Sequence, residues 1–381
     1  MANVAAIAER AREHGRIGID TEFLPEGRYR PLLCLVQVVV GEQIDLLDPL
    51  APGGFDPAPL AAVLADPEVE IILHAGRQDV AILRREWRCE ITNLFDTQVA
   101  AGFAGYPAQA GYVGLLNDAL RIRVAKSASF TRWDARPLSD EQLRYAREDV
   151  EHLLALTDHI QGRLRESGRL EWAREECRAV AAASDERDPL EVWRRLPRSG
   201  SLSPRERAVA RELAAWRERT AERENRPVGG VVRDPTMIEI VKRQPLDPKA
   251  LGQIRGIGSD VVRRRGTEVI AAVQRGQAAE PIRLEDGERF ATDAADAPTI
   301  ALAEALVRAR ALKAGLAYEL VAARADLAPI VVAARRGSPE PSVRTLQGWR
   351  RELVGEELLA LLAGERALRV DARGRVEVAE G

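Results

Sequence analysis

The segment RIGIDTEF, residues 16–23, decides how this chain begins to fold. Its residues alternate in character and a turn follows at residues 25–27, so the pattern predicts a strand. Side chains alternate across a strand, so Asp20 and Glu22 project from the same face, within reach of one shared cation. A carboxylate inside a strand that otherwise has the character of a core is costly without a partner, which favours a function for this pair.

The residues after this strand predict an α/β layer. Two more strands are expected, over residues 33–40 and 43–47. Helix and strand patterns then alternate, with a helix over 60–64, a strand over 69–74 and a helix over 78–86. This alternation predicts a sheet with helices packed on it.

A long helix is predicted over residues 139–168. Ser139 is the expected N-cap, and Gln142 three residues later completes a capping-box pattern. Tyr145 and Asp149 lie four positions apart on this helix, so their side chains share one face, one turn apart. That face could hold a carboxylate on a metal and a phenol beside a metal-bound water.

Two other acidic residues stand at predicted helix starts. Asp79 follows the buried strand in the helix's first turn, where a carboxylate also complements the helix dipole. Asp96 has the same simple explanation, and we expect it to be an N-cap. Asp79 becomes a metal-ligand candidate only as part of a larger pattern.

The composition limits the possible functions. The chain has 381 residues, of which 46% are hydrophobic and 30% charged, as in globular proteins. It has no run of eighteen apolar residues and no signal-peptide pattern, so we expect no membrane association. Its three cysteines are far apart, which favours a cytoplasmic location. Its four histidines show no zinc spacing, so a catalytic metal must be held by carboxylates, the ligands preferred by Mg²⁺ or Mn²⁺.

The charge is distributed unevenly. Residues 200–278 carry 16 Lys and Arg against 10 Asp and Glu, whereas residues 1–199 carry 25 against 32. An acidic first half beside a basic middle fits an acidic metal centre attached to a module that binds a polyanion. An ordinary mosaic of solvated helix faces explains the same charges equally well.

The chain divides into a first domain and two helical regions. The segment 183–204 is rich in Pro, Ser and charge and is interpreted as the connection out of the first domain. Beyond it the patterns are helical to about Leu368, in two sets of similar order that suggest a weak internal duplication. The predicted boundaries are a first domain over 1–185, a linker over 186–202, a helical domain over 203–280, a linker over 281–295 and a second helical domain over 296–381.

Four sequence blocks in register carry a family resemblance. They are DTEF (20–23), HAGRQDVAIL (74–83), DTQVAAGF (96–103) and KSASFTRWDARPLSDEQLRYAREDV (126–150). Together they resemble the ribonuclease D family, 3′→5′ exoribonucleases of the ribonuclease-H-like superfamily that is defined by four acidic residues and a tyrosine. The resemblance covers about residues 15–185. Residues 203–280 resemble the helicase-and-ribonuclease-D C-terminal (HRDC) domain, and residues 296–370 resemble a more diverged copy.

The resemblance implies the fold and the metal centre. The fold class is then α/β, a ribonuclease-H-like exonuclease with a mixed sheet flanked by helices, followed by two all-α domains. Two divalent ions, Mg²⁺ or Mn²⁺, are expected among four carboxylates, and Tyr145 is expected to orient the attacking water. The four expected ligands are Asp20, Glu22, Asp79 and Asp149.

Substrate contacts are expected from several other residues. In the first domain they are Thr21, Phe23, His74, Lys126, Ser127 and Arg136. In the helical domain Arg226, Arg233, Arg255 and Arg264 are expected to follow an RNA backbone. Phe23 serves equally well as a core residue. A lone histidine after a buried strand, such as His74, is more often a structural residue, and the loop residues have the alternative role of solvated side chains. Phe130 and Arg132 depart from the usual Arg and Asp of the family, which puts the substrate contacts in doubt and not the acidic set.

The leading functional hypothesis is therefore an RNA-processing exonuclease. It would act as a monomer on the 3′ ends of tRNA precursors and other structured small RNAs, and release nucleoside 5′-monophosphates. One alternative is a DNA-directed 3′→5′ exonuclease of the kind found fused to helicases, although the helicase motif G-x-x-x-x-G-K-[ST] is missing. The other is a catalytically silent RNA-binding protein, which the presence of all four acidic residues disfavours.

Overall fold

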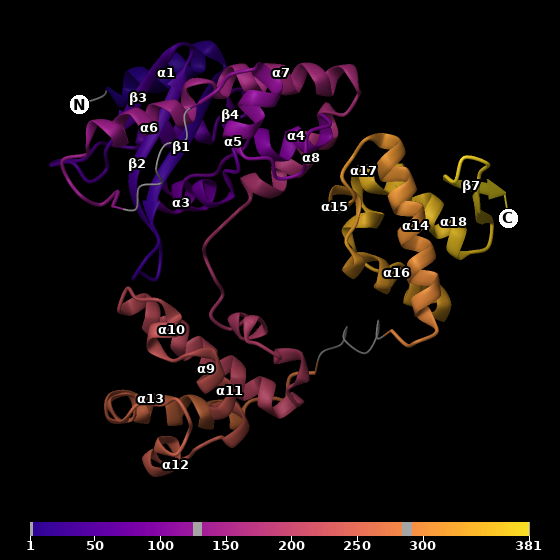
Figure 1. Cartoon of the computed structure of the whole chain (residues 1–381). Coiled ribbons are helices and arrows are strands. Elements are labelled where there is room, and N and C mark those ends of the chain that lie inside the picture. The colour runs from indigo at the N-terminus through magenta and orange to yellow at the C-terminus, as the bar shows by residue number, and fades with distance from the viewer. Residues whose placement is uncertain (1–2, 125–131, 284–291, 381) are drawn as a thin grey trace. The chain divides into compact units, whose positions relative to one another are not determined.

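The computed structural model describes residues 3–124, 132–283 and 292–380. The chain forms two compact units (Figure 1). Unit 1 comprises residues 1–23, 33–184 and 290–381, and unit 2 comprises residues 24–32 and 185–289. The first domain and the last helical region therefore belong to the same unit, and the short segment 24–32 belongs to the other.

Unit 1 is built on a five-stranded mixed sheet with the order β3-β2-β1-β4-β5. Strands β2 and β3 are antiparallel, whereas β4 is parallel to both β1 and β5. The strands are β1 (Arg16–Leu24), β2 (Leu32–Val40), β3 (Gln43–Leu47), β4 (Glu70–Leu73) and β5 (Leu94–Asp96). The predicted α/β layer is confirmed, and the strand that carries Asp20 and Glu22 lies at its centre.

Helices surround this sheet (Figure 1). They are α1 (Val4–His14), α2 (Ala58–Leu64), α3 (Arg77–Trp87), α4 (Thr97–Phe103), α5 (Tyr112–Leu115), a π-helix (Leu116–Leu120), α6 (Asp140–Glu151), α7 (Leu153–Glu166) and α8 (Leu170–Ala181). The sheet packs closely against α7: a Cβ added to Gly18 of β1 would lie 2.6 Å from a methyl of Val39 and 3.2 Å from one of Leu153. A side chain at residue 18 would therefore separate the strand from the helix.

The prediction of a single long helix over 139–168 is wrong in one respect, because this segment forms two helices. Its start is as predicted, since Ser139 and Gln142 form a complete capping box. However, α6 ends at Glu151, and His152 leaves the helical region with a ψ of 6° before α7 begins. The apolar stripe continues across this break, because Val150 and Leu153 are both fully buried. Periodicity alone therefore could not reveal it.

Unit 2 is helical apart from its connections. Its elements are two 3₁₀ turns (Val192–Arg195 and Ser199–Ser201), α9 (Pro204–Arg223), α10 (Val228–Val231), α11 (Asp234–Arg243), α12 (Pro248–Gly252) and α13 (Ser259–Ala278). Ser203 caps α9 with Glu206 in a second capping box, and Pro204 occupies the first helical turn, where proline is favoured. The two longest helices touch at Gly276, where an added Cβ would lie 2.4 Å from the Cα of Val209.

The last part of the chain is helical and then forms a hairpin. The elements are α14 (Asp296–Ala314), α15 (Tyr318–Val321), α16 (Arg324–Arg336), a 3₁₀ turn (Arg344–Leu346), α17 (Gly348–Arg350), a π-helix (Arg351–Gly355), α18 (Glu356–Leu362), β6 (Arg366–Val370) and β7 (Val376–Glu380). The expectation of helix up to Leu368 is corrected at its end, because β6 and β7 pair antiparallel. Asp371 accepts hydrogen bonds from the backbone N–H groups of Arg373 and Arg375, which holds the turn between these strands.

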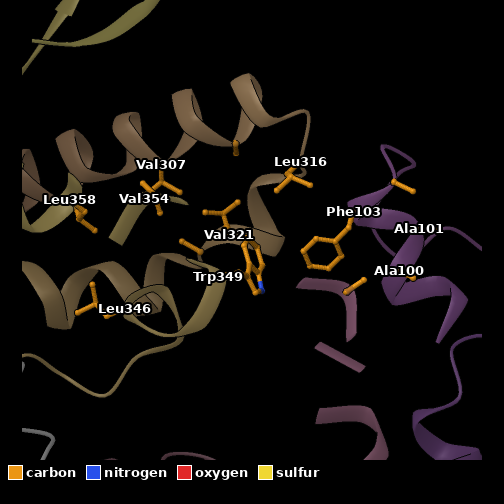
Figure 2. Packing of buried hydrophobic residues seen from close by; sticks show 14 of the residues in the cluster. Ala100, Ala101, Phe103, Val307, Leu316, Val321, Leu346, Trp349, Val354 and Leu358 are labelled. Atoms are coloured by element: carbon orange, nitrogen blue, oxygen red, sulfur yellow. The ribbon is translucent and has the colours of Figure 1, made fainter. Parts of the chain in front are cut away.

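This last region shares a core with the first domain. Phe103 at the end of α4 meets Trp349 edge to face, with ring centroids 5.0 Å apart (Figure 2). Trp349 also stacks on Trp172 of α8 at 5.2 Å. Leu320 occupies the space beside Gly102, where an added Cβ would lie 2.8 Å from one of its methyl groups. One continuous apolar cluster therefore spans both parts of unit 1.

Within the described residues, no helix is both long and apolar enough to cross a membrane.

Candidate active site

Three acidic side chains meet where β1 passes α6. Asp20 and Glu22 alternate with buried residues on β1, as the strand pattern predicts, and Asp149 lies on α6. One oxygen from each carboxylate can be chosen so that all three lie within 4.8 Å of one another. Residues that are distant in sequence thus form one acidic cluster, which we call the carboxylate cluster.

Asp79 lies next to this cluster but is not one of its three members. It is 8% exposed in the first turn of α3, and Thr21 of β1 donates a hydrogen bond from Oγ1 to its Oδ1. Its charge acts on both Asp20 and Glu22 and contributes to raising the pKa of each. Asp79 is therefore within electrostatic reach of the carboxylate cluster, while its carboxylate is engaged by Thr21.

Burial raises the pKa of every acidic residue in this set, and repulsion within the set adds to the effect at Asp20 and Glu22. Burial, followed by the charges of Asp149 and Asp79, raises the pKa of Glu22 to about 8. Burial raises the pKa of Asp149 to about 7 and that of Asp79 to about 6, against opposing hydrogen bonds from Tyr145 and Thr21. Burial, then its three acidic neighbours, raises the pKa of Asp20 well above its ordinary value.

The donor set fits divalent cations. Among the residues that the structure describes, no Lys or Arg forms an ion pair with Asp20, Glu22, Asp79 or Asp149. Partly buried carboxylates close together with no counter-charge are costly, and a cation held between them reduces both the repulsion and the desolvation cost. The ligands are all carboxylate oxygens, which suit Mg²⁺ and Mn²⁺.

Tyr145 is placed beside the carboxylate cluster, one helical turn before Asp149. Its phenol hydrogen-bonds with the Asp149 carboxylate. Burial first, and then the charges of Asp149 and Glu22, raise the pKa of this phenol above its ordinary value. The hydroxyl therefore remains protonated near neutral pH and can orient an oxygen ligand, but it is a poor base. Its ring lies 6.1 Å from that of Trp133, a core residue that is 3% exposed.

The residues expected to contact substrate have different surroundings. Thr21 is buried and bound to Asp79, and Phe23 is partly buried against the core of the first domain. His74 is half-buried, and burial lowers its pKa. Its Nδ1 lies 3.0 Å from Thr97 Oγ1. Lys126 and Ser127 lie outside the described residues, as does Phe130.

Arg136 is engaged within the protein. Its Nε and Nη2 donate to the two carboxylate oxygens of Asp48 at 2.7 and 2.5 Å. The other three N–H groups donate to the carbonyls of Cys34, Trp133 and Ala135. Because every donor of the guanidinium has a partner, the structure favours an anchoring role for Arg136 over the expected phosphate contact.

The arginines expected to bind RNA in unit 2 also divide into two kinds. Arg233 and Arg255 are exposed. Arg226 donates to the carbonyl of Gly230, and Arg264 pairs with Asp260 one turn earlier on α13. Arg233 and Arg255 therefore present their charge to solvent more freely than the other two.

Tyr112 is a residue near the site that the sequence did not indicate. Its ring meets that of His74 with centroids 5.4 Å apart, and its hydroxyl is buried. Burial first, and then the charges of Asp149 and Asp20, raise its pKa against an opposing backbone hydrogen bond at His152, so Tyr112 lies within electrostatic reach of the acidic residues. A single aromatic residue in a segment without clear periodicity gives no signal of this kind in the sequence.

Comparison with known proteins identifies the family. A family model described as 3′-5′ exonuclease matches residues 2–165, and a model described as HRDC domain matches residues 206–273. Ribonuclease D of Gluconacetobacter diazotrophicus is 36% identical, with 97% of this chain and 93% of the relative covered. Ribonuclease D of Acidiphilium cryptum is 35% identical, with 99% and 95% covered.

A solved structure agrees with these relatives. The crystal structure of Escherichia coli RNase D, described as an exoribonuclease involved in structured RNA processing, matches with a TM-score of 0.83. It is 29% identical and the match covers 94% of this chain and 96% of that one. The predicted fold class is confirmed, and so is the family resemblance carried by the four sequence blocks. The chain belongs to the ribonuclease D family and is a 3′→5′ exoribonuclease.

Proposed function

We propose that Asp20, Glu22, Asp79 and Asp149 hold two divalent cations, Mg²⁺ or Mn²⁺, at the scissile phosphate of an RNA 3′ end. The observation that supports this most directly is the carboxylate cluster, in which three oxygens lie within 4.8 Å of one another without a described counter-charge. Exonucleases of this superfamily generally use divalent metals. Asp79 joins the set through a rotation of its side chain away from Thr21, which is the partner it has in this structure.

Each residue then has a chemical role. Two bound cations supply charge stabilisation for the attacking and leaving oxygens of the phosphodiester. Asp20 would be the central ligand of the set, because the charges of all three other acids act on it. Tyr145, protonated and hydrogen-bonded to Asp149, orients the attacking water. The product is a nucleoside 5′-monophosphate.

We further propose that the substrates are 3′ ends of tRNA precursors and other structured small RNAs, bound by the protein as a cytoplasmic monomer. The support is the match to Escherichia coli RNase D, whose description names structured RNA processing. The HRDC-type module adds exposed cations such as Arg233 and Arg255 that suit an RNA backbone. A folded RNA with a single-stranded 3′ extension offers the extension to the catalytic site and the rest of its backbone to the HRDC-type module.

A direct experiment separates the metal assignment from the substrate assignment. The protein and its Asp20→Asn variant are titrated with Mn²⁺ in a calorimeter, and both are incubated with a tRNA carrying a 3′ extension. We expect two bound ions and stepwise release of 5′-monophosphates for the protein, and loss of both for the variant. Retained hydrolysis by folded Asp20→Asn would contradict the site. If the protein degraded a linear RNA but left the extended tRNA intact, the result would contradict the proposed substrate class and leave the metal site supported.

A further inference from the structure

The turn that leads into Asp79 has an unfavourable backbone. Strand β4 ends at Leu73 and α3 begins at Arg77, so only three residues connect them. Ala75 has a φ of 55°, in the left-handed region that residues with a Cβ rarely adopt. Gly76 is packed so closely that an added Cβ would lie 2.6 Å from the Cβ of Leu73. Such a conformation persists only where surrounding contacts impose it.

Asp96 supplies those contacts. Its Oδ1 accepts a hydrogen bond from the backbone N–H of Ala75 at 3.1 Å, and its Oδ2 accepts one from that of Gly76 at 2.9 Å. Oδ1 also accepts from the N–H groups of Gln98 and Val99, which confirms the expected N-cap of α4. Capping alone uses only the last two bonds. The carboxylate thus joins the start of α4 to the turn before α3.

Thr97, the next residue, contacts the first part of the same turn. Its Oγ1 donates to the carbonyl of Leu73 at 3.1 Å and lies 3.0 Å from Nδ1 of His74. Asp96 and Thr97 are 1% and 0% exposed. These two buried side chains therefore contact four consecutive residues, from Leu73 to Gly76.

Asp96 is itself fixed in place. It pairs with Leu73 in the β4–β5 register, and its backbone N–H donates to the Sγ of Cys177 on α8 at 3.2 Å. Among the described residues no Lys or Arg pairs with its carboxylate, so its partners are backbone N–H groups. A carboxylate held by several N–H groups is oriented more strictly than one in a flexible ion pair.

We propose that Asp96, assisted by Thr97, is a positioning residue for the metal ligand Asp79. The inference rests on the proposed function, because it assumes that Asp79 binds a cation. Asp79 follows Gly76 by three residues in the first turn of α3, so the turn sets the position of its Cα, from which the side chain can rotate toward a cation. Loss of the Asp96 contacts releases Ala75 from the left-handed region and tilts the start of α3. Residues that orient metal ligands in this way typically change metal affinity 10–100-fold when replaced.

The test is a direct Mn²⁺ titration of folded protein, read by calorimetry and by the loss of the free-Mn²⁺ electron paramagnetic resonance signal. Asp96→Asn keeps the size of the side chain but presents an NH₂ group to one of the backbone N–H donors. We expect its Mn²⁺ affinity to fall by about 10-fold or more. KM for RNA should stay unchanged, and high Mg²⁺ should restore much of kcat. Asp247→Asn is the matched control, since Asp247 caps α12 through the single N–H of Ala250 and holds no such turn.

Two further variants keep the outcome decisive. Thr97→Val, which preserves shape and removes only the Oγ1 contacts, replaces Asp96→Asn if the latter does not fold by circular dichroism. Unchanged Mn²⁺ affinity in the folded variant, with only a lower melting temperature, would overturn the inference. Asp20→Asn is titrated in parallel. If Asp20→Asn binds Mn²⁺ normally, the proposed metal site is wrong. If Asp20→Asn loses Mn²⁺ binding while Asp96→Asn binds Mn²⁺ normally, only the positioning role is overturned.

Discussion

Arg350 donates two hydrogen bonds to Glu176, at 2.5 and 2.8 Å, and thereby joins the C-terminal helical region to α8 of the first domain. Nε1 of Trp349 donates to the same carboxylate at 3.1 Å. Burial acts to raise the pKa of Glu176, but the hydrogen bonds and charge of Arg350 outweigh it, so the pKa lies below its ordinary value. The last region is therefore attached to the exonuclease fold by a specific polar contact as well as by the shared apolar cluster.

Arg350→Ala should destabilise unit 1 by about 1.5–3 kcal/mol, the range for hydrogen bonds to a charged group, because the Glu176 side chain is a quarter exposed and partly screened by solvent. Only 6% of the Arg350 side chain is exposed, and its loss leaves Glu176 without its main counter-charge. Urea unfolding followed by tryptophan fluorescence measures the loss. Arg351→Ala is the control, because Arg351 pairs with Glu340 on the surface and should cost far less. Equal losses of unfolding free energy in the two variants would show that the Arg350–Glu176 pair stabilises unit 1 no more than a surface ion pair does.

Tyr29→Phe should loosen the segment 24–32 from the helices of unit 2. The Tyr29 hydroxyl donates to Oε1 of Glu218 at 2.9 Å, and Glu218 is 2% exposed. Arg187 still pairs with this carboxylate at 3.2 Å, so we expect a loss on the order of 1 kcal/mol. Hydrogen exchange of the α9 amides and calorimetric melting check it. Tyr318→Phe is the control, because it removes a hydroxyl that has no partner among the described residues and should leave stability unchanged. A loss of the same size in Tyr318→Phe would mean that the effect at Tyr29 does not come from its hydrogen bond to Glu218.

Parts of the site could be predicted from local spacing, but their assembly could not. The strand period places Asp20 and Glu22 on one face, and the helix period does the same for Tyr145 and Asp149. Nothing in either period brings Asp149 to β1; that expectation came only from the family resemblance. Asp96 could be predicted as a cap, but its two bonds to the turn depend on residues about twenty positions earlier.

The failures of the sequence analysis have similar causes. A loop arginine has no period, and the partner of Arg136 is Asp48, 88 positions away, so its engagement could not be foreseen. The hairpin of β6 and β7 was missed because β6 is largely exposed and so lacks a buried apolar face. The break at His152 was missed because the buried stripe continues through it.

The metal-free protein should lose stability as pH rises from about 4 to about 8. The pKa values of Glu22, Asp149 and Asp79 are raised to about 8, 7 and 6, so in this window the folded chain holds protons that the unfolded chain has already released. Raising the pH removes these protons at a cost to the folded state. Melting temperatures across this range measure the effect, and Mg²⁺ should raise them more at pH 8 than at pH 5.5. Asp149→Asn should have a shallower pH dependence; an unchanged slope would mean that the repulsion in the carboxylate cluster is negligible.

Two Gly→Ala substitutions in helices should have opposite signs. At Gly276 of α13 the new methyl would lie 2.4 Å from the backbone of α9, and we expect a loss of about 1–3 kcal/mol from the forced separation. At Gly162 of α7 no atom lies within 4 Å, so the higher helix propensity of alanine should stabilise by about 0.5–1 kcal/mol. Thermal melting of both variants decides this. A stabilised Gly276→Ala would show that α9 and α13 are not packed backbone to backbone.

Tyr145→Phe and Asp149→Asn should separate water positioning from metal binding. The phenol is protonated near neutral pH because burial and the neighbouring acids raise its pKa, so its removal should lower kcat by about 10²-fold while Mn²⁺ affinity stays intact. Asp149→Asn removes a member of the carboxylate cluster and should lose both. Single-turnover rates across pH, together with Mn²⁺ calorimetry, distinguish the two. If Tyr145→Phe also eliminated a limb of the pH–rate profile near neutrality, the hydroxyl would be titrating there, and its role would be proton transfer instead of orientation.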